Sequence, residues 1–135
     1  NFVNLDNFAG PLEEYLQLEG PRKEVKRRFQ GFILNFRDEL TKKNLYVRRI
    51  KKMCTDNKQS LEVCYLELSA EVPLLAIWIA DEPEEMLKIL DEEATHVTSL
   101  LFPDVRKICF YLVSFVFHLC FKKNTQKLTH VYMSP

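Results

Sequence analysis

The sequence predicts a mainly α-helical fold, a small bundle of about four helices with one strand or a small hairpin. Three observations predict this fold. Apolar residues recur at steps of three and four over residues 22–40 and again over 83–101. A two-residue alternation occupies only residues 61–68. At 135 residues the chain is long enough to bury one core and too short for two.

The first long helix is expected from Arg22 to about Leu40, after a leading segment of residues 1–20 with at most a turn or two of helix. Pro21 suits its first turn, where a missing N–H does no harm. Gly31 lies inside this helix and costs about 1 kcal/mol relative to alanine, which close helix packing could offset. The inward positions are Val25, Phe29, Phe32, Ile33, Phe36 and Leu40.

A second, shorter helix is expected from Tyr46 to about Cys54, followed by a turn at residues 55–60. The string LEVCYLEL, residues 61–68, then alternates like a strand. A single strand leaves backbone groups unpaired, so we expect a partner strand elsewhere.

Residues 72–80 form an apolar helix that should be largely buried, with Trp78 inside it. Asp81 is expected to cap the next helix, and Glu84 three residues later completes a capping-box pattern. That helix should run from about Pro83 to Leu101 and stop before Pro103. The expected caps and core positions are Pro21, Asp81, Pro83, Glu84, Trp78, Leu87, Leu90, Leu101 and Pro103.

The residues indicate no catalytic, cofactor-binding or metal site. The three glycines are too scattered for a phosphate loop, and the three histidines are too far apart for a metal pair on adjacent helical turns. The carboxylates crowd a helix start, whereas acid–base catalysis needs groups opposed in a cleft. No two of the four cysteines have zinc-site spacing, so we expect buried free thiols.

Net charge is zero but unevenly placed: residues 1–60 carry 13 bases and 8 acids, whereas residues 61–105 carry one base and 11 acids. A basic stripe of this kind can neutralise DNA phosphates without reading sequence. The alternative is a solvated helix surface that the acidic fourth helix balances. The possible contacts to the DNA backbone are Arg22, Lys23, Lys26, Arg27, Arg48 and Arg49.

Residues 108–121, ICFYLVSFVFHLCF, are almost wholly apolar. They are too short to span a bilayer, which needs about 20 residues. The two alternatives are a buried helix and a strand, and the Phe, Tyr and Val content favours the strand. No secretory leader is visible at the start, and because the first residue is not Met we expect a fragment of a longer protein.

Three strings in order resemble the N-terminal helical subdomain of minichromosome maintenance (MCM) proteins, the subunits of the replicative helicase. They are GPRKEVKRRFQGFIL (20–34), NLYVRRIKKMCTDNKQSLEVCYLEL (44–68) and LLAIWIADEPEEMLKILDEEATHVTSLLFPDVRKI (74–108). The last is similar to a family pattern of alanine, apolar residue, acid, any residue and proline, followed by a helix that ends at Phe/Tyr-Pro. The string at 12–29 is most similar to subunit two of the eukaryotic heterohexamer.

The resemblance implies a non-catalytic module of a nuclear helicase subunit, which serves ring assembly, loading and regulation in replication initiation. Its implied partners are other MCM subunits and loading or regulatory factors, with DNA bound weakly if at all and no membrane. ATP and Mg²⁺ would belong to a separate AAA+ module of the parent helicase. The rival interpretation is a stand-alone helical adaptor that binds a partner through its acidic block or apolar tail.

The resemblance departs after Ile108, where the family continues to a strand of the His-x-x-Val-Arg-Ile kind and an OB-fold. We therefore expect the family subdomain at residues 21–108 and an anomalous apolar tail at 109–135. Our hypothesis is that residues 109–129 are an insertion, such as translated non-coding sequence, because they lack acids and are rich in aromatic residues. Transcript sequencing that finds these codons in the dominant mature message would remove it.

Overall fold

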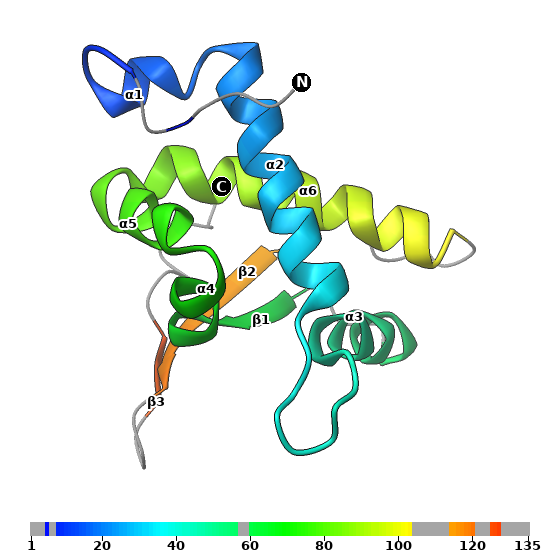
Figure 1. Ribbon diagram of the computed structural model, residues 1–135. Helices are drawn as coiled ribbons and strands as arrows, with labels where there is room; N and C mark the ends of the chain where they lie inside the picture. Colours follow the sequence, from blue (N-terminus) through cyan, green and yellow to red (C-terminus); the bar gives the residue numbers. More distant parts are fainter. Residues whose placement is uncertain (1–4, 6–7, 57–59, 104–113, 121–124, 128–135) are drawn as a thin grey trace.

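The computed structural model describes residues 5, 8–56, 60–103, 114–120 and 125–127 (Figure 1). Within these ranges it contains six helices and three strands, and the expectation of a mainly α fold is confirmed. The elements in chain order are α1 (Leu12–Tyr15), α2 (Glu19–Asn35), α3 (Leu45–Thr55), β1 (Ser60–Cys64), α4 (Tyr65–Glu71), α5 (Pro73–Asp81), α6 (Pro83–Leu101), β2 (Ser114–Cys120) and β3 (Thr125–Lys127).

Helices α2 and α6 cross and pack against each other at the centre of the fold (Figure 1). The apolar stripe of α2 buries Val25, Phe29 and Ile33 completely. The leucine seam of α6 does the same with Leu87 and Leu90, as the spacing predicts. These side chains belong to one continuous core cluster, because each helix can hide its apolar face only against another element.

The first long helix is shorter than expected and ends at Asn35, not near Leu40. Phe36 is already extended, with ψ at 129°, and Leu40 is 92% exposed. The cause is a loop whose polar side chains bond to the backbone in place of helical partners. Asp38 accepts from the N–H of Leu40, and the side chain of Asn44 donates to the carbonyl of Leu34 and accepts from the N–H of Val47.

The expectation of a strand over residues 61–68 is only half right. The chain is extended to Cys64 and then enters α4 at Tyr65. Leu61, Tyr65 and Leu68 are also spaced by four and three, so the same letters fit both periods. The helical turn buries Leu68 completely and lets the Tyr65 hydroxyl donate to the carbonyl of Ala76 at 2.6 Å.

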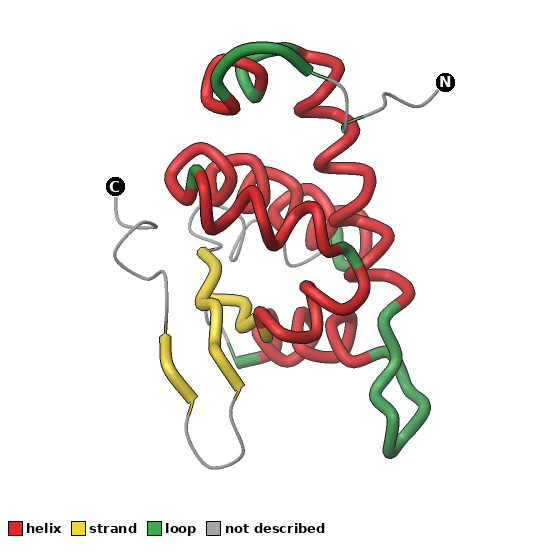
Figure 2. The backbone as a smooth tube through the Cα atoms, turned by 60° about the vertical axis from the view of Figure 1, so that its left-hand side comes forward, coloured by secondary structure: helices red, strands yellow, loops and turns green. Residues whose placement is uncertain are grey.

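The expected partner of this strand lies in the C-terminal part of the chain. Strand β1 pairs with β2 in parallel, from Ser60 opposite Ser114 to Cys64 opposite His118, and β2 pairs with β3 antiparallel. Parallel neighbours need a long crossover, and here α4, α5 and α6 lie between the two strands in the sequence. Figure 2 shows the three strands together on one flank of the helices. The strand predicted for the apolar tail is thus present at residues 114–120.

The corner between α5 and α6 is a single residue, Glu82. Pro83 occupies the start of α6 as predicted, but the capping box does not form. Asp81 remains the last residue of α5, and Glu82 stands at the cap position without a side-chain cap bond. The N–H of Glu82 still bonds to the carbonyl of Trp78 at 2.8 Å, so α5 extends through Asp81, which is therefore a helical residue and not the cap of α6.

The other expected caps and core positions divide by burial. Trp78 is buried at 4% exposure, Leu101 is partly buried, and Pro103 is exposed. Pro21 is buried in the first turn of α2, which begins two residues before it, at Glu19. Glu84 is an exposed acid in the first turn of α6, where it faces the positive end of the helix dipole.

Candidate interaction surface

The basic stripe on α2 is largely neutralised by carboxylates of the same chain. Lys26 Nζ lies 2.8 Å from Glu92 on α6, and a terminal nitrogen of Arg22 lies 3.3 Å from the same carboxylate. The acidic fourth helix therefore supplies counter-ions for the first long helix. For Arg22 and Lys26 the alternative interpretation, a helix surface whose charge is balanced by α6, therefore fits the structure.

Two further bases of the stripe pair within α2 itself. Lys23 lies 2.7 Å from Glu19, with both side chains about three-quarters exposed. Glu24 is 4% exposed and accepts hydrogen bonds from both Arg27 and Arg28. The hydrogen bond from Arg27, above all, holds the pKa of Glu24 below its usual value. The i, i+3 and i, i+4 spacing of these groups is a signal that sequence reasoning passed over.

The two arginines expected to contact DNA from α3 differ in role. Arg49 donates to the carbonyl of Glu62 at 2.9 Å and lies over the Tyr46 ring at 5.2 Å from its centroid. Arg48 is exposed and, like Lys51, forms no ion pair with the described residues. We call Arg48, Lys51 and Lys52 the α3 basic face; Lys52 pairs with Asp56 at 2.9 Å.

A polar cluster that the sequence did not reveal lies between α2 and α6. Glu93 is 6% exposed, accepts from Gln30 Nε2 at 3.0 Å and lies 3.4 Å from His96 Nδ1. Burial raises the pKa of Glu93, and the hydrogen bonds from His96 and Gln30 oppose that rise.

Asp91 is a second carboxylate on α6. It is half-buried, and its Oδ1 has no hydrogen-bond partner among the described residues. Burial raises the pKa of Asp91 to about 6.

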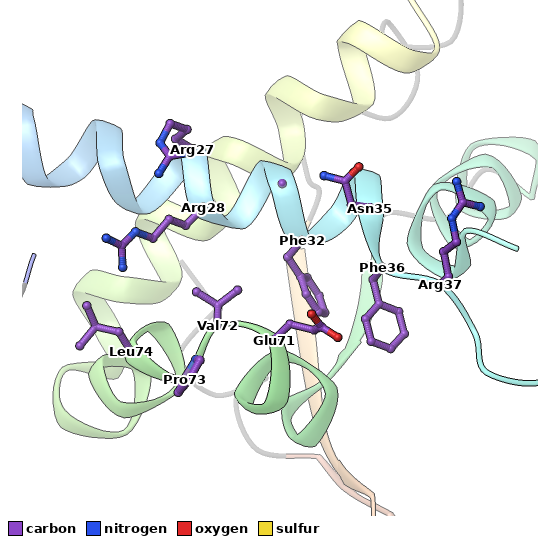
Figure 3. Close-up of a pocket in the computed structure, with 11 residues that line it drawn as sticks. Arg27, Arg28, Phe32, Asn35, Phe36, Arg37, Glu71, Val72, Pro73 and Leu74 are labelled. Carbon is purple, nitrogen blue, oxygen red and sulfur yellow. The ribbon is translucent and has the colours of Figure 1, made fainter. Parts of the chain in front are cut away.

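An open groove of about 840 Å³ lies between α2 and the corner where α4 meets α5 (Figure 3). Its apolar lining comes from Phe32 and Phe36 on one side and from residues 72–74 on the other. Arg27, Arg28 and Arg37 lie around it, as does one acid, Glu71. This groove is not predictable from local sequence patterns, because residues about 40 positions apart in the chain build its two walls.

No site for a metal or a membrane span is found in the described part of the chain. No three ligand-type side chains there are arranged to hold a metal ion. No helix there combines the length and the apolar character that crossing a bilayer requires. Cys54 and Cys64 are buried, as expected, and neither forms a disulfide with a described residue, whereas the side chains of Cys109 and Cys120 lie outside the described set.

The similarity of the chain to known proteins identifies its family. Residues 26–131 match the family described as the MCM N-terminal domain. The chain belongs to that family. The match begins within the basic stretch of α2 and includes every described element from α3 to β3, so the resemblance seen in the sequence is confirmed.

Curated relatives are similar to the chain over most of its length. The DNA replication licensing factor mcm2 of Xenopus laevis is 30% identical over 123 residues, which is 91% of this chain and 14% of that protein. The Drosophila melanogaster Mcm2 is 33% identical over 78% of this chain and 12% of its own length, and the Schizosaccharomyces pombe mcm2 is 32% identical over 76% and 12%. The chain thus spans about a seventh, or less, of each relative.

The position of the tail within the family is open to a direct test. The family match extends to residue 131 and so includes residues 109–129. Strand β2, inside that range, pairs with β1. The hypothesis that residues 109–129 are an insertion stays a prediction, to be decided by sequencing the transcript.

Proposed function

We propose that this chain is the non-catalytic N-terminal module of an MCM-type subunit of the replicative DNA helicase, and that it acts in ring assembly, loading and regulation. The observation that carries the proposal is the family match over residues 26–131. The relatives, named as DNA replication licensing factors, support the role in initiation and a position in the nucleus. The stand-alone adaptor is the less favoured function, because the match to the MCM N-terminal domain already accounts for the helical pattern of the chain.

Other MCM subunits are the proposed partners, together with loading and regulatory factors. The proposal is tested by mixing the 135-residue chain with purified N-terminal domains of the other five subunits and measuring complex formation by analytical ultracentrifugation. Binding to at least one of these domains is expected. A chain that is folded by circular dichroism and binds none of them would reject the role in ring assembly.

The sequence beyond this chain separates the two functions. A helicase subunit should continue into an OB-fold, a zinc-type cysteine set and a G-x-x-x-x-G-K-[ST] phosphate loop, where ATP and Mg²⁺ would bind. An adaptor should end early, at a genuine stop. Reading the parent gene downstream of residue 135 is therefore the least costly experiment.

A weak contact with the DNA backbone is proposed for the α3 basic face and not for the α2 stripe. Arg22, Lys23 and Lys26 already have carboxylate partners, whereas Arg48 and Lys51 form no ion pair with the described residues. Binding of labelled duplex DNA should weaken steeply as salt rises, because phosphate contacts release counter-ions. Replacing Arg48 and Lys51 by glutamine should lower both affinity and salt slope, and Lys23→Gln is the control.

Two results would reject the DNA contact. The first is a binding curve without the expected salt dependence, which includes the case in which no DNA binding is measured. The other is a loss in Lys23→Gln as large as that in the α3 variant, since this would return the contact to α2.

A further inference from the structure

The groove between α2 and the α4–α5 corner has the build of a docking site. Phe32 on α2 and Phe36 just after it line one wall, and Val72, Pro73 and Leu74 line the other (Figure 3). Phe36, Val72 and Leu74 are only partly buried, so apolar surface remains in contact with water. Its volume of about 840 Å³ is within the range of ligand-binding clefts, about 300–1,000 Å³.

Gly31 lies in the wall of this groove, and packing within the chain does not explain it. Among the described residues, a Cβ built at Gly31 would meet only the Asn35 side chain, at 4.0 Å, so none of the described helices approaches closely there. The expectation that close helix packing offsets the cost of this glycine is wrong. Glycine in mid-helix reduces stability, and one of its common uses is to let another molecule approach the backbone.

The charges around the groove favour an acidic occupant. Arg28 bonds to Glu24 through its Nε, and its two terminal nitrogens make no hydrogen bond within the described residues. The Arg37 side chain donates one long hydrogen bond within the described residues, 3.4 Å, to the carbonyl of Lys42. Of the described residues that line the groove, Glu71 is the one acid against three arginines. Because Arg27 and Arg28 already contact Glu24, the positive charge available to an occupant comes mainly from Arg37 and the terminal nitrogens of Arg28.

We propose that this groove binds a short acidic segment of a partner protein, whose apolar side chain packs against Phe36, Val72 and Leu74. Carboxylates flanking that side chain would pair with Arg28 and Arg37. From Arg27 to Asn35, where α2 ends, the helical wall is about 12 Å long at 1.5 Å per residue, which an extended peptide covers with about four residues at 3.3 Å each. The apolar lining favours a peptide over the backbone of a nucleic acid, which offers phosphate but no aliphatic anchor.

The test uses the intact 135-residue chain and a short fluorescein-labelled peptide with glutamate and aspartate around one phenylalanine and one leucine, read by fluorescence anisotropy. Two control peptides replace either the two apolar residues by serine or the acids by lysine. Binding of the first peptide alone is expected. Equal binding of the serine peptide would show a purely electrostatic surface and would overturn the proposal, as would no binding of any peptide.

Variants of the chain locate the binding site. Gly31→Leu should fill the opening and weaken binding at least about tenfold while the melting temperature does not fall, because leucine is a better helix former. Arg28→Ala and Arg37→Ala should each weaken binding about two- to fivefold, the effect of losing one exposed ion pair. Lys88→Ala, which removes an exposed charge from α6 outside the groove, is the control and should leave peptide binding unchanged.

Nucleic acid is the competing occupant of the groove, and a competition experiment in the same anisotropy assay distinguishes it from a peptide. A single-stranded oligonucleotide should leave the peptide bound, and its own binding should be unaffected by Gly31→Leu. If the oligonucleotide displaces the peptide and Gly31→Leu weakens both, the groove is a nucleic-acid site and the proposal is wrong. The groove lining shares no residue with the α3 basic face, and the peptide assay contains no MCM subunit, so this result is separate from those that test the proposed function.

Discussion

The carboxylate of Glu92 on α6 lies 2.8 Å from the Nζ of Lys26 on α2. This pair joins the two helices that cross at the centre of the fold, and Arg22 shares the same carboxylate. Glu92 is half-exposed and Lys26 is 30% exposed, so solvent screens the attraction. The pair therefore contributes modestly to stability, and it gives two bases of α2 a carboxylate partner within the chain.

Replacing Glu92 by glutamine should lower the free energy of unfolding by about 0.5–1 kcal/mol, the usual range for exposed ion pairs. The melting temperature should fall by about 2–5 °C in a domain of this size. Thermal melts at low and high salt measure the effect, which should shrink as salt rises. Glu39→Gln, an exposed acid in the loop before α3, is the control; equal melting temperatures for the Glu92 variant and the parent would contradict the prediction.

The Tyr46 hydroxyl connects three elements. It accepts from the N–H of Cys64 at 3.0 Å and donates to Glu67, so it fixes the point where β1 passes into α4. Tyr46→Phe keeps the buried ring and removes both hydrogen bonds. We expect a loss of about 1–2 kcal/mol in urea unfolding. Tyr15→Phe is the matched control, because no hydrogen bond of its hydroxyl is found among the described residues; equal losses in the two variants would show that the hydroxyl of Tyr46 contributes nothing special.

The sequence predicts α5 and α6 well because their signals are local. Pro73 and Pro83 mark helix starts, and the leucines of α6 repeat at helical spacing. The cap at Asp81 is wrong because the sequence does not say how far the preceding helix runs. That limit is a matter of tertiary packing, since Trp78 and Ile79 are buried in the core and hold the last turn of α5 together.

The limits of sequence reasoning are clearest where two distant segments meet. Charge asymmetry predicts that acids of the fourth helix balance the bases of the first, but it does not say that Glu92 would pair with Arg22 and Lys26. The switch from strand to helix at Tyr65 depends on a hydrogen bond to Ala76 that no local pattern contains. The groove is missed for the same reason, because its two walls come from α2 and from residues 71–74.

Asp91 should make the stability of the protein depend on pH. Burial, followed by the charge of Glu92, raises its pKa to about 6 in the folded chain, whereas an unfolded aspartate titrates near about 3.9. The folded state therefore holds its proton more tightly, and ionised Asp91 destabilises the fold as pH rises from about 4 to about 6. Asp91→Asn should then raise stability at neutral pH, by about 1 kcal/mol once solvent screening of a half-buried group is allowed for.

The measurement is the difference in free energy of unfolding between Asp91→Asn and the parent at pH 5 and pH 7.5. The advantage of the variant should be larger at pH 7.5. Other groups, Glu93 among them, titrate in both proteins and cancel in the difference. Glu84→Gln, an exposed acid of the same helix, should show no such growth; an advantage of Asp91→Asn that is the same at both pH values would exclude the raised pKa as its cause.

The two glycines Gly31 and Gly10 should respond to alanine in opposite directions, although neither has a crowded Cβ position. Gly31 is helical, so Gly31→Ala should stabilise the fold by about 0.5–1 kcal/mol through the lower backbone entropy of the unfolded chain. Gly10 has φ at +88°, a conformation that L side chains rarely adopt, so Gly10→Ala should destabilise by about 1 kcal/mol. Urea unfolding of both variants measures the pair. Because space is available at both positions, the backbone alone separates them; a loss of stability in Gly31→Ala would mean that another segment of the chain approaches the groove wall closely and that the open groove is absent in solution.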